Sequence, residues 1–133
     1  MADRYFTPAE VEALIPTLTR LIEPLMRAHR EASGIQEALQ EERRQIAMAG
    51  GAVVDQAAWR ARVERLERLT EEIRGGLERI SALGGVTKDL DMGLVDFAHR
   101  RAGRTVNLCW RYGEERVTHW HGLDEGYAAR KPL

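Results

Sequence analysis

Residues 93–121 decide the fold of this chain, and they read GLVDFAHRRAGRTVNLCWRYGEERVTHWH. Apolar and polar residues alternate in three short runs within this stretch, and a two-residue period is typical of strands that bury one face. Turns at Ala102-Gly103 and Tyr112-Gly113 separate the runs, and turns this short join antiparallel strands. The sequence therefore predicts a three-stranded antiparallel β-meander over residues 93–121.

The pairing of these strands follows if both turns contain two residues. Phe97, Leu108 and Val117 then align across the face that packs on the rest of the protein. A β-bulge in either turn would shift the register and exchange the two faces. On the opposite face we expect a row of Asp96, Cys109 and Arg116 with Trp120 nearby. This face, together with Tyr127, is the predicted interaction surface.

Two long helices are predicted upstream, over residues 7–84. Thr7, Pro8 and Glu10 form the pattern of a helix N-terminus with a capping box. Apolar residues recur every three or four positions beyond it, which is the period of one helical face. Pro16 and Pro24 lie within this pattern and predict a bend in the first helix, because each removes a backbone hydrogen bond.

The second helix has its own boundary signals. Gly50-Gly51 marks a turn, Asp55 is placed to cap the new helix, and Gly84-Gly85 ends it. The pair Gly75-Gly76 lies inside the helix, where each glycine costs about 1 kcal/mol relative to alanine. This pair predicts either a close helix contact or a functional hinge.

The lengths of the helices predict self-association. At the rise per residue of an α-helix they span about 60 Å and about 40 Å. Two helices and three short strands cannot cover apolar stripes of that length. We therefore expect a homodimer in which two helical hairpins pair as a four-helix arrangement.

Composition limits the classes of partner. The chain has 133 residues, with 20 basic and 21 acidic side chains and a net charge of −1, so broad electrostatic capture of nucleic acid or of a membrane is not expected. Its one cysteine cannot form an internal disulfide, and neither a secretory signal nor a stretch of about 20 apolar residues is present. These observations predict a single-domain cytoplasmic protein that does not contact membranes.

The motifs of the C-terminal half resemble a known prokaryotic family. The runs KDLDMGLVDF at 88–97 and LCWRYGE at 108–114, followed by Trp120-His121, Asp124 and Gly126-Tyr127, are similar to the domain of unknown function 2203. The opening Phe6-Thr7-Pro8 is similar too, so the resemblance covers essentially the whole chain. It implies a small cytoplasmic bacterial protein with no established activity. The chain departs from the family pattern at Ala98 and Ala129, where proline and glycine are expected.

Two groups of side chains are candidate binding sites. His119, His121 and Asp124 could hold a zinc-like metal ion, because two imidazoles two positions apart on a strand face the same side. A basic hairpin tip is formed by Arg100, Arg101 and Arg104. It could contact an anion or a nucleic acid, with Trp120 stacking on a base. A solvated loop and a partly buried histidine are the simpler explanations of the same residues.

The fold class predicted from the sequence is α+β. It comprises a helical hairpin at 7–84, a β-meander at 93–121 and a docking tail at 122–133. We expect an interaction or scaffold module without catalytic activity and without a cofactor, acting on an unidentified protein partner. Metal binding through the His119, His121 and Asp124 group is the alternative, and nucleic-acid contact is a weaker one.

Overall fold

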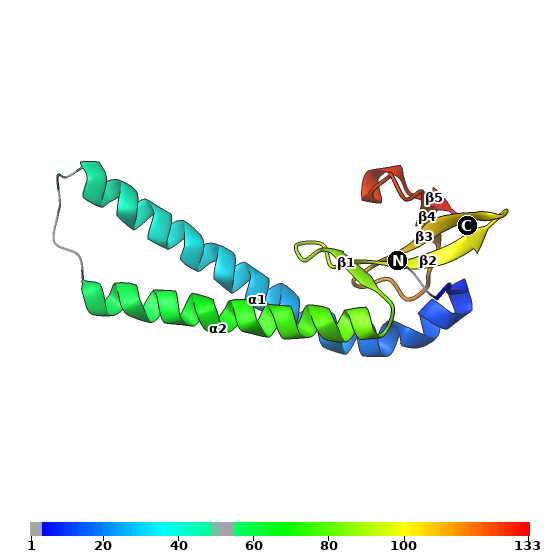
Figure 1. The fold of residues 1–133 in the computed structure, drawn as a ribbon, viewed down its shortest axis with the longest axis horizontal. Coiled ribbons are helices and arrows are strands. Elements are labelled where there is room, and N and C mark those ends of the chain that lie inside the picture. The colour runs from blue at the N-terminus through cyan, green and yellow to red at the C-terminus, as the bar shows by residue number, and fades with distance from the viewer. Residues whose placement is uncertain (1–3, 49, 51–54) are drawn as a thin grey trace.

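The structure, a computed structural model, describes residues 4–48, 50 and 55–133. Two helices precede an antiparallel sheet, so the predicted α+β class with a helical hairpin is confirmed (Figure 1). The sheet has five strands in the order β1-β2-β3-β4-β5 rather than the predicted three. The elements are α1 (Pro8–Met48), α2 (Gln56–Ala82), β1 (Val86–Asp89), β2 (Leu94–Arg101), β3 (Arg104–Arg111), β4 (His119–His121), the 3₁₀-helix η1 (Tyr127–Ala129) and β5 (Lys131–Pro132).

Local signals set the first boundary as predicted. The backbone N–H of Glu10 donates to Thr7 Oγ1 at 3.1 Å, and the N–H of Thr7 donates to Glu10 Oε1 at 2.9 Å, which is a capping box. Helix α1 then continues without interruption through Pro16 and Pro24. Figure 1 shows that its blue N-terminal part curves beneath the sheet, whereas its cyan part runs straight away from the sheet.

The second helix also begins and ends where the sequence predicts. The Asp55 carboxylate accepts a hydrogen bond from the N–H of Ala58 at 3.0 Å. Gly84 follows the helix with a φ of +100°, a left-handed conformation that favours glycine after a helix C-terminus. Of the predicted Gly50-Gly51 turn, Gly50 has a φ of +67°, and Gly51 lies outside the described residues.

Strands β2 and β3 pair in the predicted register. Phe97 lies opposite Leu108, and Val95 lies opposite Trp110. The connecting turn has φ values of +50° at Ala102 and +77° at Gly103, as a two-residue hairpin turn of type I′ requires. The short turn therefore fixes this half of the sheet locally.

The predicted register of the last meander strand is wrong. Leu108 pairs with Trp120, three residues beyond the predicted Val117. Residues 112–118 form a longer connection, because the Val117 N–H donates to Glu12 Oε1 at 3.1 Å and the Trp110 Nε1–H donates to the Glu114 carbonyl at 3.0 Å. A shift by an odd number of residues moves every side chain of β4 to the other face of the sheet.

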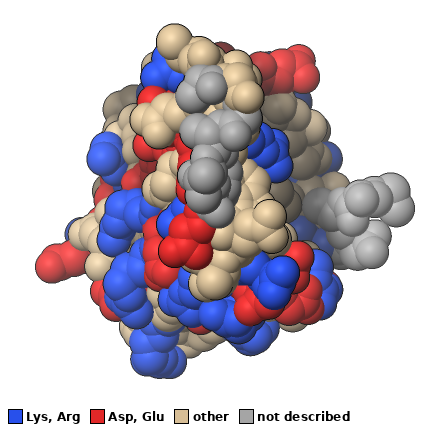
Figure 2. Space-filling model, turned by 90° about the vertical axis from the view of Figure 1, so that its left-hand side faces the viewer, with Lys and Arg blue, Asp and Glu red and all other residues tan. Residues whose placement is uncertain are grey.

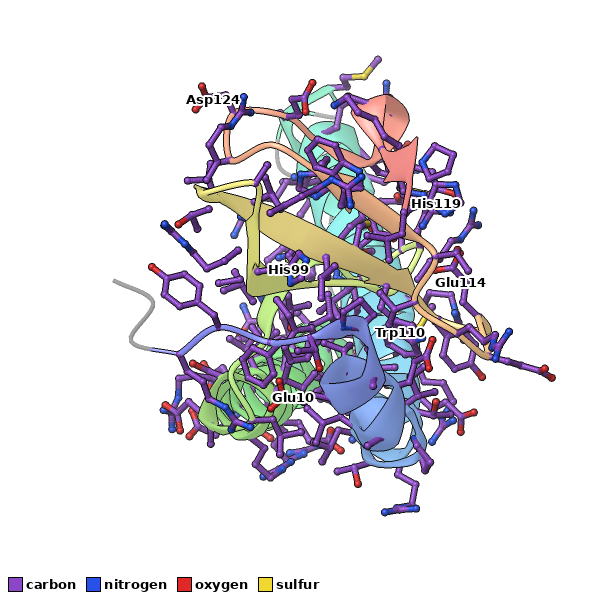
Figure 3. The ribbon with its side chains drawn as sticks, turned by 90° about the vertical axis from the view of Figure 1, so that its right-hand side faces the viewer. Glu10, His99, Trp110, Glu114, His119 and Asp124 are labelled. Carbon is purple, nitrogen blue, oxygen red and sulfur yellow. The ribbon has the colours of Figure 1, made fainter. Side chains whose placement is uncertain are left out.

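The main core lies between the sheet and the helices. Phe97, Leu108 and Trp110 are fully buried on the face that was predicted to pack against the helices. Figure 3 shows Trp110 on the helix side of the sheet. The cluster comprises Phe6, Val11, Leu18, Ile22, Leu25, Met26, Ile80, Val95, Phe97, Leu108, Trp110 and Val117.

Beyond the sheet, the two helices are held together by fewer contacts. A small cluster of Ala28, Ala32 and Leu69 is buried between them, and Arg65 Nε pairs with Glu31 Oε2 at 2.7 Å. The helices diverge toward their connection (Figure 1). Acidic and basic side chains are interspersed over this end of the molecule (Figure 2). No described helix is long and apolar enough to cross a membrane.

The two glycines inside α2 have different surroundings. A Cβ atom on Gly76 would lie 2.2 Å from Leu25 Cδ2, whereas a Cβ atom on Gly75 would meet only Arg79 Nη1 at 3.6 Å. Because Leu25 is itself buried in the core, Gly76 is the point where α1 packs closely on α2.

This difference predicts opposite effects of two matched substitutions. Gly75→Ala should raise the free energy of unfolding by up to about 1 kcal/mol, since alanine is the better helix former. Gly76→Ala should lower it by about 1–2 kcal/mol, because overpacking outweighs the same gain. Urea denaturation of both variants measures the difference, and equal stabilisation by both would contradict the close contact.

Candidate metal centre

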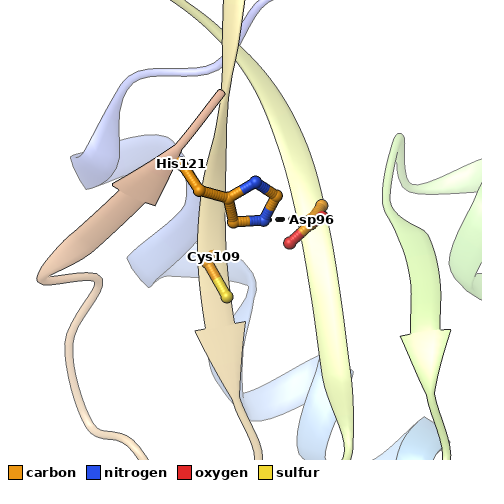
Figure 4. A group of neighbouring side chains, drawn as sticks. All are labelled: Asp96, Cys109 and His121. Atoms are coloured by element: carbon orange, nitrogen blue, oxygen red, sulfur yellow. Dashed lines mark ion pairs between the residues drawn. The ribbon is translucent and has the colours of Figure 1, made fainter. Parts of the chain in front are cut away.

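Three strands bring Asp96, Cys109 and His121 together on the face of the sheet away from the helices. Asp96 lies on β2, Cys109 on β3 and His121 on β4 (Figure 4). One carboxylate oxygen, the thiol sulfur and one ring nitrogen lie within 4.8 Å of one another. The three residues are 2%, 1% and 2% exposed. The odd shift of β4 produces this arrangement, because the register expected from the sequence places His121 on the opposite face.

His121 presents its Nε2 atom to this group. Its Nδ1 lies 2.8 Å from the Gly122 carbonyl, which can only accept, so Nδ1 carries the proton and donates it. The Gly122 N–H donates in turn to Glu125 Oε1 at 2.7 Å, which holds the turn in place. Metal-binding histidines commonly donate their other ring N–H to a carbonyl in this way. Its Nε2 atom faces Asp96 and forms an ion pair with this carboxylate when the ring is protonated (Figure 4).

Asp96 is a buried carboxylate that lies between His121 and Cys109. Its Oδ2 lies 3.0 Å from His121 Nε2, but the contact lacks the alignment of a hydrogen bond, and neither oxygen has another partner among the described residues. Burial raises the pKa of Asp96 above its usual value, and the His121 ring opposes this shift. Most buried polar atoms are paired, so this carboxylate is well suited to a cation.

Cys109 completes the group with a sulfur atom. Burial, and then the charge of Asp96, raise the pKa of the thiol to about 11. The Arg130 guanidinium donates from Nη1 to Sγ at 4.0 Å and pairs through Nη2 with Glu114 at 3.0 Å. A thiol with so high a pKa is a poor nucleophile near neutral pH but a strong ligand once a metal displaces its proton.

The raised pKa predicts how the stability of the metal-free protein depends on pH. Between about pH 9 and about pH 11 the unfolded chain loses the Cys109 proton while the folded chain keeps it. The free energy of unfolding should therefore fall over this interval, by on the order of 2–3 kcal/mol. Denaturant titrations of the protein and of a Cys109→Ala variant isolate this contribution, and parallel pH profiles of the two would contradict it.

The geometry fits a tetrahedral transition metal. Zinc binds sulfur at about 2.3 Å and nitrogen or oxygen at about 2.0–2.2 Å, so its ligand atoms lie roughly 3–4 Å apart. The present separations, up to 4.8 Å, require only small side-chain movements. One carboxylate, one thiolate and one imidazole leave a fourth position free, as in zinc sites that bind water or a substrate.

The structure does not gather the metal ligands expected from the sequence. His121 belongs to the centre, but Thr118 Oγ1 lies 2.8 Å from His119 Nδ1, and Asp124 is exposed in the loop after β4. Figure 3 shows His119 and Asp124 at opposite ends of the sheet. The side chains grouped with His121 are Asp96 and Cys109, instead of the expected His119 and Asp124.

The basic hairpin tip is divided between the two faces of the sheet. Arg100 lies over the Tyr5 ring at 5.5 Å, while Arg101 lies over the Trp120 ring at 4.9 Å. Lys131 also lies over the Trp120 ring, at 4.7 Å. Arg104 lines a pocket with Trp120. The aromatic ring expected to stack on a base is thus covered by the protein's own cations.

The expected interaction surface is not one exposed face. Asp96 and Cys109 are buried, and Arg116 precedes β4 instead of facing Cys109 across the sheet. Trp120 lies on the same side as Leu108, with which it pairs. Tyr127 belongs to η1, and its ring lies 4.5 Å from the Arg130 guanidinium. The tail that contains it adds β5 to the sheet and covers Cys109.

The sequence predicted two of the three candidate metal ligands in one row across the sheet. It placed Asp96 opposite Cys109, and the structure has this pair. It missed His121 as their neighbour, and it missed the Arg130–Glu114 pair beside the sulfur. The only local signal for β4 is its alternation, which leaves the register open when the preceding connection is long.

Fold and site together define an α+β protein with a buried three-residue candidate metal centre. The family model described as "Uncharacterized conserved protein (DUF2203)" matches residues 4–133. The chain belongs to this family, as its motifs indicated. No curated protein and no solved structure matches it.

Proposed function

We propose that this protein binds one zinc-like divalent metal ion between Asp96, Cys109 and His121. The observation that carries the proposal is the buried group itself. An Asp96 oxygen, the Cys109 sulfur and a His121 ring nitrogen lie within 4.8 Å of one another, and Asp96 accepts no well-aligned hydrogen bond from the described residues. A divalent ion would neutralise the carboxylate and the thiolate and would replace the ion pair between Asp96 and His121. Binding would release the Cys109 proton, so affinity should rise with pH.

Metal content tests the proposal directly. Untagged protein is freed of metal with a chelator, incubated with excess zinc, desalted and measured by elemental mass spectrometry. We expect about one zinc per chain, as for a site with three protein ligands. Fewer than about 0.1 zinc per chain, in protein with normal helix content, would overturn the proposal.

We also propose that the helical hairpin self-associates. A hollow of about 430 Å³ lies between the diverging helix ends, lined by Ile46, Trp59 and Val63 with Arg43 and Arg60 at its edge. The small Ala28–Leu69 cluster fills only the part of the hairpin nearer the sheet. The apolar ends of a second hairpin would fill the hollow.

Light scattering on a sizing column measures this association. At micromolar concentration the mass should be twice the 15.1 kDa of the chain. Trp59→Asp should reduce the mass toward that of one chain, because it places a charge in the apolar hollow. Glu67→Asp, on the same helix, is the matched surface control. A monomeric mass for the unaltered protein would refute self-association and would leave the metal proposal untouched.

A further inference from the structure

A pocket of about 550 Å³ adjoins the candidate metal centre. Its floor includes Asp96 and Ala98 of β2 and Thr105 and Asn107 of β3, which share one face of the sheet. Asn107 pairs with His121, so the pocket and the centre lie in adjacent rows of that face. Asp96 belongs to both. A ligand in this pocket could therefore reach a metal held by Asp96.

The walls of the pocket are unusually apolar for a surface. Tyr5, Val86 and Leu123 are 45%, 56% and 61% exposed, and all three line it. Among the described residues, only two other large apolar side chains are exposed, Met48 and Leu133. Clustered exposed apolar side chains around a concavity mark a binding site for an apolar group.

Two guanidinium groups stand beside the same pocket. Arg4 lines it and lies 4.3 Å from the Phe6 ring centre, and Arg100 lies over the ring of Tyr5. Arg100 donates its hydrogen bonds to neutral oxygens, the Thr105 hydroxyl and the Gly103 carbonyl. The Arg4 guanidinium is 3.8 Å from Glu10 in an exposed pair that solvent screens. The potential at this mouth favours an anion.

A metal bound as proposed would also accept an oxygen ligand from the pocket. Beside Asp96, Cys109 and His121, a zinc-like ion would keep one coordination position for a further ligand. An anionic oxygen is a suitable fourth ligand for zinc. Resting on the proposed metal site, we infer that the pocket binds a small organic carboxylate whose apolar body lies against Val86 and Leu123 and whose carboxylate coordinates the metal.

Cobalt substitution makes the fourth ligand observable. The metal-free protein is loaded with Co²⁺, and its visible absorption is followed while hexanoate is added. We expect a saturable change in the absorption bands, because an incoming ligand alters the coordination of the cobalt. Acetate should bind at least about tenfold more weakly, since it lacks the methylenes that would be buried. Hexylamine, which has the same chain and a positive charge, should produce no change.

A variant of the wall separates pocket binding from simple coordination. Leu123→Glu places a negative charge on an exposed wall position and should weaken hexanoate binding by at least about tenfold. Leu133→Glu makes the same change at an exposed leucine that does not line the pocket, and should leave the affinity unchanged. Neither residue is a proposed metal ligand, so both variants should still bind one cobalt ion.

The outcomes distinguish the two proposals. If cobalt binds stoichiometrically but hexanoate leaves the spectrum unchanged, or if acetate binds as tightly, the carboxylate inference is overturned and the metal site stands. Equal weakening by Leu123→Glu and Leu133→Glu would also overturn it. If cobalt itself does not bind, the proposed metal function fails, and the carboxylate inference fails with it.

Discussion

Replacing His121 by alanine is expected to abolish stoichiometric zinc binding and to lower zinc affinity by more than about 100-fold. Loss of a partner that merely orients a ligand costs about 10–100-fold, and this substitution removes the ligand itself. The Nε2 atom lies 3.0 Å from Asp96 and is the one imidazole nitrogen in the group. Competition with a chromophoric chelator at fixed pH measures the affinity.

The chain supplies its own control for this experiment. His119 is two residues away on the same strand, but it is not among the three grouped residues, so His119→Ala should retain one zinc ion. Asp96→Asn keeps the shape of the side chain while weakening it as a ligand, and it should lose zinc with the fold intact. Equal zinc affinity of the His121→Ala and His119→Ala variants would contradict the assignment of His121 as a zinc ligand.

Of the substitutions proposed for this protein, Trp110→Ala should lower the free energy of unfolding the most. Trp110 is fully buried between the sheet and the helices, and its Nε1–H donates to the Glu114 carbonyl. Truncating a buried tryptophan costs about 3–5 kcal/mol, through lost apolar burial and the cavity left behind. This is a large part of the stability of a domain of this size. Urea denaturation followed by circular dichroism measures the change.

Trp120, on strand β4 of the same sheet, provides the comparison. It is only partly buried, and its ring lies between the cations of Arg101 and Lys131. Trp120→Ala should therefore cost about 1–2 kcal/mol, mainly through partial burial and the two cation–π contacts. If Trp120→Ala is as damaging as Trp110→Ala, the core is not centred on the face of the sheet that meets the helices.

Contacts between near neighbours in sequence allowed much of the fold to be predicted. The Thr7–Glu10 capping box, the Asp55 cap and the left-handed Gly84 set helix boundaries through bonds spanning a few residues. The two-residue turn at Ala102-Gly103 fixes the pairing of β2 with β3 in the same way. Each of these features depends on local geometry, so the sequence alone determined it.

The edges of the sheet could not be predicted so well. Strand β1 has only four residues, Val86–Asp89, too few for an alternating pattern to stand out in the sequence. Strand β5 has two residues and is held by pairing with β4. In both cases neighbouring strands supply the hydrogen bonds that define the element, so the stretch itself carries little signal.

The candidate metal centre was decided by tertiary structure. The sequence by itself determined that Asp96 faces Cys109, because a short turn joins their strands. Which histidine joins them depends on the connection at 112–118, and this is held by contacts far apart in the chain, such as Val117 with Glu12. Those contacts shift β4 by three residues, and an odd shift exchanges its two faces. His121 meets Asp96 and Cys109 for that reason.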